Sequence, residues 1–170
     1  MKTMTINIYS YKELSDKAKE RARDKWRETA LDYQWWEFTY EDAENIGIKI
    51  TEFDTYRGTI KGHFTESADF TANKILSDHG DKCSTWAEAN HYRKTMEEFM
   101  ANAEKDEYGE LATYKLDNEK EEIEDDFLHS MLEQHLKMLR DEYEYQMSDE
   151  VIEECIIMND PEYLENGNFA

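Results

Sequence analysis

A long amphipathic helix in the second half of the sequence limits the folds that the chain can adopt. Its apolar side chains recur mostly at intervals of three or four residues, the spacing that places them on one face of a helix. They are Ile123, Phe127, Met131, Leu132, Leu136, Leu139 and Tyr143. We predict that this helix opens at Asn118, and that its apolar face packs either within one chain or between the two chains of a homodimer.

The rest of the sequence from Ser67 onward also predicts helices. One spans Ala68 to Asp78, and a second begins at Ser84. A last short helix lies between Ser148 and Pro161. Serine is a favoured N-terminal capping residue because its side chain accepts a hydrogen bond from a free backbone N–H, and proline cannot continue a helix. We therefore expect a C-terminal half that is helical.

The N-terminal part predicts mixed structure. Thr3 to Tyr9 alternates apolar and polar residues, which is typical of a half-buried strand. A helix follows over residues 15–31, and a second helix ends at Gly47. Apolar residues from Ile48 and the segment Thr59 to Thr65 predict two further strands. We expect the three strands to form one small antiparallel sheet.

These elements define an α+β fold class, with a small antiparallel sheet of about three strands packed with several helices. The sequence holds one proline and six glycines and contains no low-complexity linker. We therefore predict a single domain over residues 1–170, with a mixed α/β part over 1–66 and an acidic helical part over 67–170.

The charge of the chain is concentrated in its last part. The net charge is -21, and residues 97–170 hold 24 of the 41 acidic residues but only 5 of the 20 basic ones. This surplus of negative charge argues against direct binding of nucleic acid, because phosphates would be repelled. It favours a basic protein partner, such as a nuclease or a nucleic-acid-binding complex.

We predict that carboxylates on the last two helices bind this partner by pairing with its lysine and arginine side chains. The predicted partner-binding residues are Glu119, Glu121, Glu122, Glu124, Asp125, Asp126, Glu153 and Glu154. Carboxylates spaced along a helix resemble a row of phosphates, so a basic groove could accept them in place of nucleic acid. The same acidity also has simpler causes, because the helix dipole favours acidic residues near a helix N-terminus and because charge solubilises a surface.

No pattern for catalysis, a cofactor or a metal is found in the sequence. The five histidines form neither HExxH nor a zinc spacing, and His129 and His135 fall on different faces of the predicted helix. Six scattered glycines make no phosphate-binding loop, and Cys83 has no context of a cysteine hydrolase. We therefore predict no catalytic, cofactor-binding or metal-binding residues, and a protein that is not an enzyme.

The expected location is a bacterial cytoplasm, without membrane attachment. Cys83 and Cys155 are far apart and form no disulfide framework, which suits a reducing compartment. The start of the sequence has no apolar signal region, and no apolar run approaches the length that spans a membrane.

Two further features have competing interpretations. Basic residues of the 15–31 helix alternate with acidic ones, a pattern that favours a solvated helix surface over a nucleic-acid contact. The Trp35-Trp36 pair belongs either to the core or to an exposed binding platform.

The segment Ile8 to Arg23 contains the pattern ELSxxAKxxA after a strand-like opening. This segment resembles a family of small acidic proteins of tailed phages and prophages. The EYEY sequence at 142–145, followed by SDE at 148–150 and Asn159, is similar to the ending of that family. Some members carry antitoxin-like labels. The resemblance implies an accessory phage protein and brings no catalytic residues.

Charge and resemblance together lead to one main functional expectation. The protein is expected to be a phage-encoded inhibitor of a host defence or nucleic-acid-handling protein, of the anti-CRISPR or anti-restriction type, with the chemistry of a nucleic-acid mimic. One alternative is an antitoxin-like protein that neutralises a small basic toxin. A further alternative is an enzyme, which would show a buried cluster of ionisable residues in a cleft.

Overall fold

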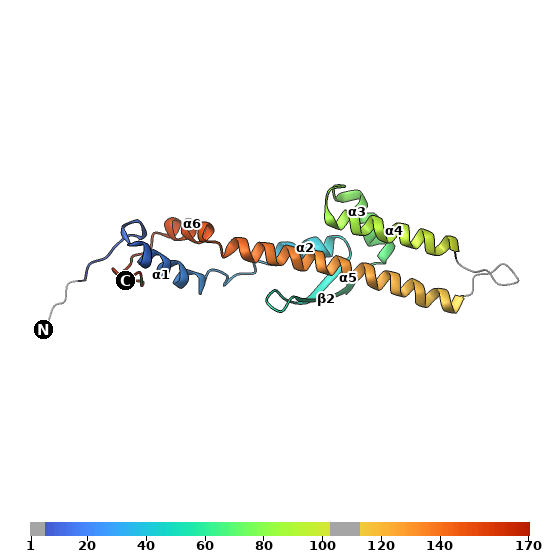
Figure 1. The fold of residues 1–170 in the computed structure, drawn as a ribbon, viewed down its shortest axis with the longest axis horizontal. Coiled ribbons are helices and arrows are strands. Elements are labelled where there is room, and N and C mark those ends of the chain that lie inside the picture. The colour runs from blue at the N-terminus through green and yellow to red at the C-terminus, as the bar shows by residue number, and fades with distance from the viewer. Residues whose placement is uncertain (1–5, 103–112) are drawn as a thin grey trace. The chain divides into compact units, whose positions relative to one another are not determined.

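The computed structural model describes residues 6–102 and 113–170, and it shows an α+β protein that is mostly helical (Figure 1). A short 3-10 helix, Tyr11–Glu13, precedes the first α-helix. The helices and strands are α1 (Asp16–Arg27), α2 (Glu37–Asn45), β1 (Ile48–Asp54), β2 (Thr59–Phe64), α3 (Ala68–Asp78), α4 (Ser84–Asn102), α5 (Thr113–Gln146) and α6 (Asp149–Asn159). The predicted fold class and the helical C-terminal half are therefore confirmed.

The prediction of about three strands is wrong by one for the residues that the structure describes. Their sheet has two antiparallel strands, β1 and β2. Of the predicted first strand, residues 3–5 lie outside the described residues, and Tyr9 forms an isolated bridge with Tyr163. Ile6 and Ile8 are 56% and 52% exposed, so the two apolar side chains of this segment that the structure describes are not packed against a core. Alternation alone does not supply the surface that a half-buried strand needs.

The predicted serine caps at the starts of α1 and α6 are confirmed, whereas α1 ends at Arg27 and not at residue 31. The side chain of Ser15 accepts a hydrogen bond from the backbone N–H of Ala18, and Ser148 caps α6 in the same way. The bounds of α3 are those predicted. Helix α5 starts at Thr113 rather than at Asn118, about five residues earlier than its apolar stripe indicated.

The chain divides into two compact units. The first is Met1–Trp35 together with Asp141–Ala170, and the second is Trp36–Arg140. Neither boundary falls at residue 66, where the sequence changes from mixed to helical. The single domain expected for residues 1–170 stays a prediction.

The first unit is built on the contact between α1 and α6. Two small residues of α1, Ala18 and Ala22, are buried and allow Ile152 and Ile156 of α6 to approach closely. Gly167 has a φ of +85°, and a Cβ there would lie 2.1 Å from the carbonyl oxygen of Ala18. This position therefore requires glycine, both for its backbone conformation and for space.

The second unit packs helices around the β1–β2 hairpin. Gly47 follows α2 with a φ of +85° and leads into β1, in agreement with its prediction as a helix end. A Cβ at Gly62 would lie 2.8 Å from Cδ2 of Leu132, so α5 packs directly on β2. Most of the predicted α5 stripe is buried, from Phe127 to Leu139, while Tyr143 is 38% exposed.

Candidate functional site

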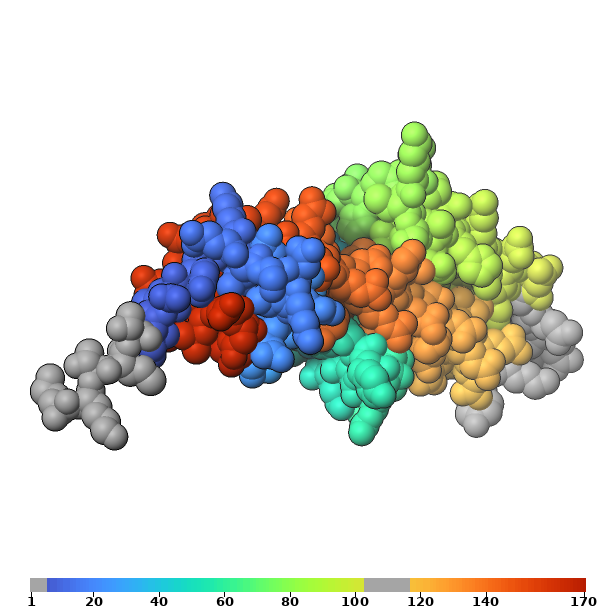
Figure 2. All heavy atoms as spheres, turned by 60° about the vertical axis from the view of Figure 1, so that its left-hand side comes forward, coloured from blue at the N-terminus to red at the C-terminus, as the bar shows by residue number. Residues whose placement is uncertain are grey.

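The predicted carboxylates of α5 lie at its surface. We call residues Glu119, Glu121, Glu122, Glu124, Asp125 and Asp126 the acidic segment of α5. All are exposed except Glu124, which is half-buried and lies 3.4 Å from Lys120 (Oε1 to Nζ). The apolar stripe occupies the face of α5 that packs inward, so these side chains are left on the outer faces. In Figure 2 this part of α5, coloured yellow to orange, forms open surface beside α4.

The two predicted carboxylates of α6 belong to the first unit and have different surroundings. Oε1 of Glu153 accepts hydrogen bonds from Nη1 of Arg23 at 2.6 Å and from the hydroxyl of Tyr11 at 2.8 Å. Glu154 is exposed. The charge of Glu153 is thus already balanced within the chain, which makes it the weaker candidate of the two for binding a partner.

This ion pair is one of a matched set that the sequence pattern did not predict. Arg27 pairs with Asp149, so two arginines four residues apart on α1 meet two carboxylates four residues apart on α6. The equal spacing of the two arginines on one helix and of the two carboxylates on the other is visible in the sequence, and it could have been used to predict that α1 packs on α6. The basic residues of α1 were predicted to form a solvated surface, yet the Arg23 side chain is only 17% exposed.

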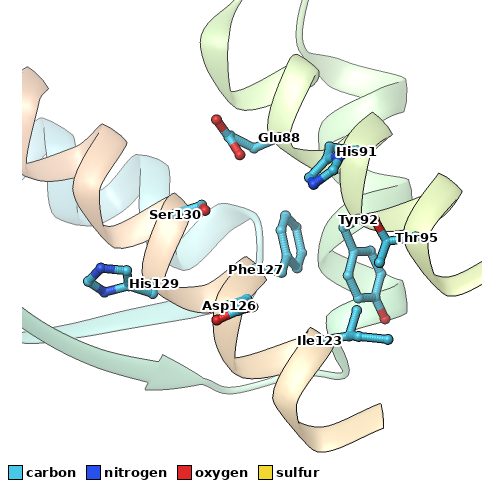
Figure 3. A pocket seen from close by; sticks show the side chains of 9 residues that line it. All are labelled: Glu88, His91, Tyr92, Thr95, Ile123, Asp126, Phe127, His129 and Ser130. Carbon is cyan, nitrogen blue, oxygen red and sulfur yellow. The ribbon is translucent and has the colours of Figure 1, made fainter. Parts of the chain in front are cut away.

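A pocket of about 250 Å³ lies between α4 and α5, next to the acidic segment (Figure 3). Helices α4 and α5 run antiparallel here. The lining residues are Glu88, His91, Tyr92 and Thr95 from α4, and Ile123, Asp126, Phe127, His129 and Ser130 from α5. Asp126 belongs both to the acidic segment and to this pocket. The pocket itself was not foreseen, because it depends on how two helices are placed.

The floor of this pocket is aromatic and well packed. The rings of Tyr92 and Phe127 stack with centroids 4.5 Å apart, and both side chains are almost fully buried. Burial, followed by the 3.0 Å hydrogen bond that the Tyr92 hydroxyl donates to Asp69, raises the pKa of Tyr92 well above its usual range. Tyr92 is therefore a neutral hydrogen-bond donor at any physiological pH.

A second group of ionisable residues is enclosed in the same unit. His135 is fully buried, its Nδ1 lies 2.7 Å from the carbonyl oxygen of Met131, and its Nε2 lies 3.6 Å from Oδ2 of Asp42. The carbonyl can only accept, so Nδ1 carries the proton of that hydrogen bond. Because no part of the ring is accessible to a substrate, we interpret this pair as structural.

The Trp35-Trp36 pair lies between the two predicted alternatives. Both side chains are half-buried. The ring of Trp35 lies 5.8 Å from that of Tyr143, and the ring of Trp36 lies 6.1 Å from that of Phe53, measured between centroids. The pair is neither fully enclosed nor a free platform.

Comparisons with protein-family models, with curated proteins and with solved structures found no match. Within the described ranges, no three His, Cys, Asp or Glu side chains are grouped in a way that could hold a metal ion. The helices of the described part also include none with the length and apolarity needed to cross a membrane. The features of the described residues that bear on function are the acidic segment of α5 and the pocket beside it.

Proposed function

We propose that this protein is a phage-encoded binding protein that inhibits a nucleic-acid-handling protein of a bacterial host, by occupying a basic groove with the acidic segment of α5. The observation that carries the proposal is a dense group of carboxylates on an ordered helix, with little compensation by nearby cations. Lys120 pairs with Glu124, and within the described residues no ion pair engages the other five carboxylates of the segment.

The charge density of the segment supports nucleic-acid mimicry. Six carboxylates lie within eight residues, which occupy about 12 Å of helix axis at a rise of 1.5 Å per residue. That is about one negative charge per 2 Å of axis, close to the value of roughly 1.7 Å for duplex DNA. A groove whose lysines and arginines are spaced for phosphates therefore meets a similar density of negative charge.

The position of the segment within α5 argues against the helix dipole as the cause of its acidity. The dipole of a helix favours carboxylates in the first turn, and this effect falls off within that turn. Because α5 starts at Thr113, Glu119 lies well beyond the first turn, and Asp126 lies further still. Repulsion among these carboxylates is unfavourable for folding, which supports a role in binding.

The proposal is tested by capture of partners on the intact chain from a lysate of phage-sensitive bacteria, at low and at high salt. We expect a basic nucleic-acid-binding protein that is retained at low salt and lost at high salt. The purified partner should then release duplex DNA when the chain is added. Capture of a small basic toxin that does not bind DNA would support the antitoxin alternative and contradict the proposal.

A charge-neutralised variant identifies the surface that is responsible. It carries E119Q, E121Q, E122Q, D125N and D126N. A matched control removes the same number of exposed carboxylates elsewhere, with E20Q, D32N, E44Q, E162Q and E165Q. We expect the first variant to lose the partner and the control to keep it. Equal loss in both variants would mean that net charge alone, and not the acidic segment, is recognised.

A further inference from the structure

The pocket between α4 and α5 presents two carboxylates from different helices. Glu88 projects from α4 and Asp126 from α5, on either side of the Phe127 ring in the view of Figure 3. Among the residues that the structure describes, neither carboxylate has a lysine or arginine partner, and the lining contains no lysine or arginine. We propose that this pocket binds one arginine side chain of the basic partner protein, an inference that rests on the proposed function.

The size of the pocket suits a side chain rather than a cofactor. Pockets for cofactors and drug-sized ligands have volumes of about 300 Å³ and upwards, whereas this one has about 250 Å³. Ile123 and Phe127 supply an apolar wall for the methylene stem of the entering side chain, while its charged end stays beside the carboxylates.

The distribution of acceptors favours arginine over lysine. Besides Tyr92, four residues with side-chain oxygen atoms line the pocket, Glu88 and Thr95 from α4 and Asp126 and Ser130 from α5. A guanidinium group carries five N–H donors in a planar fork and can reach several acceptors at once, whereas an ammonium group is a compact charge with three donors. A hydrogen bond between a guanidinium and a carboxylate is also among the stronger ones in proteins.

The test is an NMR titration of the intact, isotope-labelled chain with acetyl-arginine amide. A ligand of this size is expected to bind with a Kd on the order of 1 mM. We expect saturable shifts at Ile123, Phe127 and Ser130. Acetyl-citrulline amide has nearly the same shape but no charge, and it should produce no saturable shift. Shifts of equal size with citrulline, or none with arginine up to its solubility limit, would overturn the inference.

Single substitutions separate the pocket from the acidic segment as a whole. Asp126→Asn should weaken binding of acetyl-arginine amide about tenfold, because one charge-assisted hydrogen bond is lost. Asp125→Asn is the matched control, since it removes a neighbouring exposed carboxylate that does not line the pocket. Ser130→Phe should abolish binding by filling the pocket while leaving every carboxylate in place. Equal effects of Asp126→Asn and Asp125→Asn would contradict a defined pocket.

The same variants distinguish failure of this inference from failure of the proposed function. If the captured partner is lost on neutralising the acidic segment but tolerates Ser130→Phe, the arginine pocket is overturned and the proposed function is supported. If acetyl-arginine amide saturates the pocket but the neutralised variant still captures the partner, the pocket is supported and the proposed function is overturned.

Discussion

Both ring nitrogens of the buried His135 face oxygen atoms. Nδ1 donates to the carbonyl of Met131, and Nε2 points to the carboxylate of Asp42 at 3.6 Å. The proximity of His135 lowers the pKa of Asp42, although burial of the carboxyl raises it, and His79 adds a smaller favourable charge interaction. Because Nδ1 already donates to Met131, this stabilisation requires a proton on Nε2 as well, so the stabilised species is an ionised Asp42 beside a doubly protonated imidazole.

This contact predicts a pH-dependent effect of Asp42→Asn. A carboxyl whose pKa is depressed by folding contributes stability above its unfolded pKa of about 4, and this contribution is lost as the pH falls through the folded pKa. We expect the variant to be less stable than the wild type near pH 5, where an ordinary carboxyl is ionised and an ordinary imidazole is protonated. The difference should be about 1 kcal/mol or less, because Asp42 is partly exposed and solvent screens the contact. Denaturant unfolding at several pH values measures the difference. A difference that persists unchanged well below pH 4 would contradict a role for the ionised carboxylate.

At the scale of elements, helices α1 and α6 are joined by apolar packing and by matched charges. Ala18 and Ala22 bring the helices together, and Arg23 then reaches Glu153 and the hydroxyl of Tyr11. Because the Arg23 side chain is only 17% exposed, water screens this ion pair less than it screens a pair at an open surface.

A double-mutant cycle between Arg23→Gln and Glu153→Gln measures the energy of this pair. We expect a coupling energy of about 1 kcal/mol, because the hydrogen bond is charged and partly buried. The pair between Lys61 and Glu52 joins two exposed side chains at 2.7 Å, and it should couple by about 0.5 kcal/mol or less. Equal coupling energies in the two cycles would show that burial of Arg23 adds nothing.

At the scale of the whole molecule, the net charge of -21 is the dominant electrostatic property. Repulsion among the carboxylates opposes compactness, and salt screens it over about 10 Å at 0.1 M. We expect the thermal midpoint to rise by several degrees between low and high salt, since 1 kcal/mol corresponds to roughly 3 °C for a chain of this size. The thermal midpoint of the variant with the neutralised acidic segment should rise by less than that of the wild type. Calorimetry measures both, and a midpoint that falls with added salt would mean that attractive pairs outweigh the repulsion.

The sequence by itself determined the fold class, most helix positions and the caps at Ser15 and Ser148. The position of a helix and its cap depend on residues within a few positions of one another, so both can be predicted from the local sequence pattern. The acidic positions of α5 were also evident, because an inward-facing apolar stripe leaves the other positions of a helix outside. The exposure of Ile6 and Ile8 was not predictable, since alternation cannot reveal whether a core is present to cover these side chains.

Only the tertiary structure decided which carboxylates are balanced and where a pocket forms. Glu153 and Asp126 are both acidic residues of predicted helices, and the sequence does not distinguish them. In the structure, Glu153 accepts a hydrogen bond from Arg23, which is 130 positions away in the sequence, whereas Asp126 lines a pocket together with Glu88. These differences arise from contacts between distant segments, and the free energy of such contacts depends on burial and geometry that local patterns do not contain.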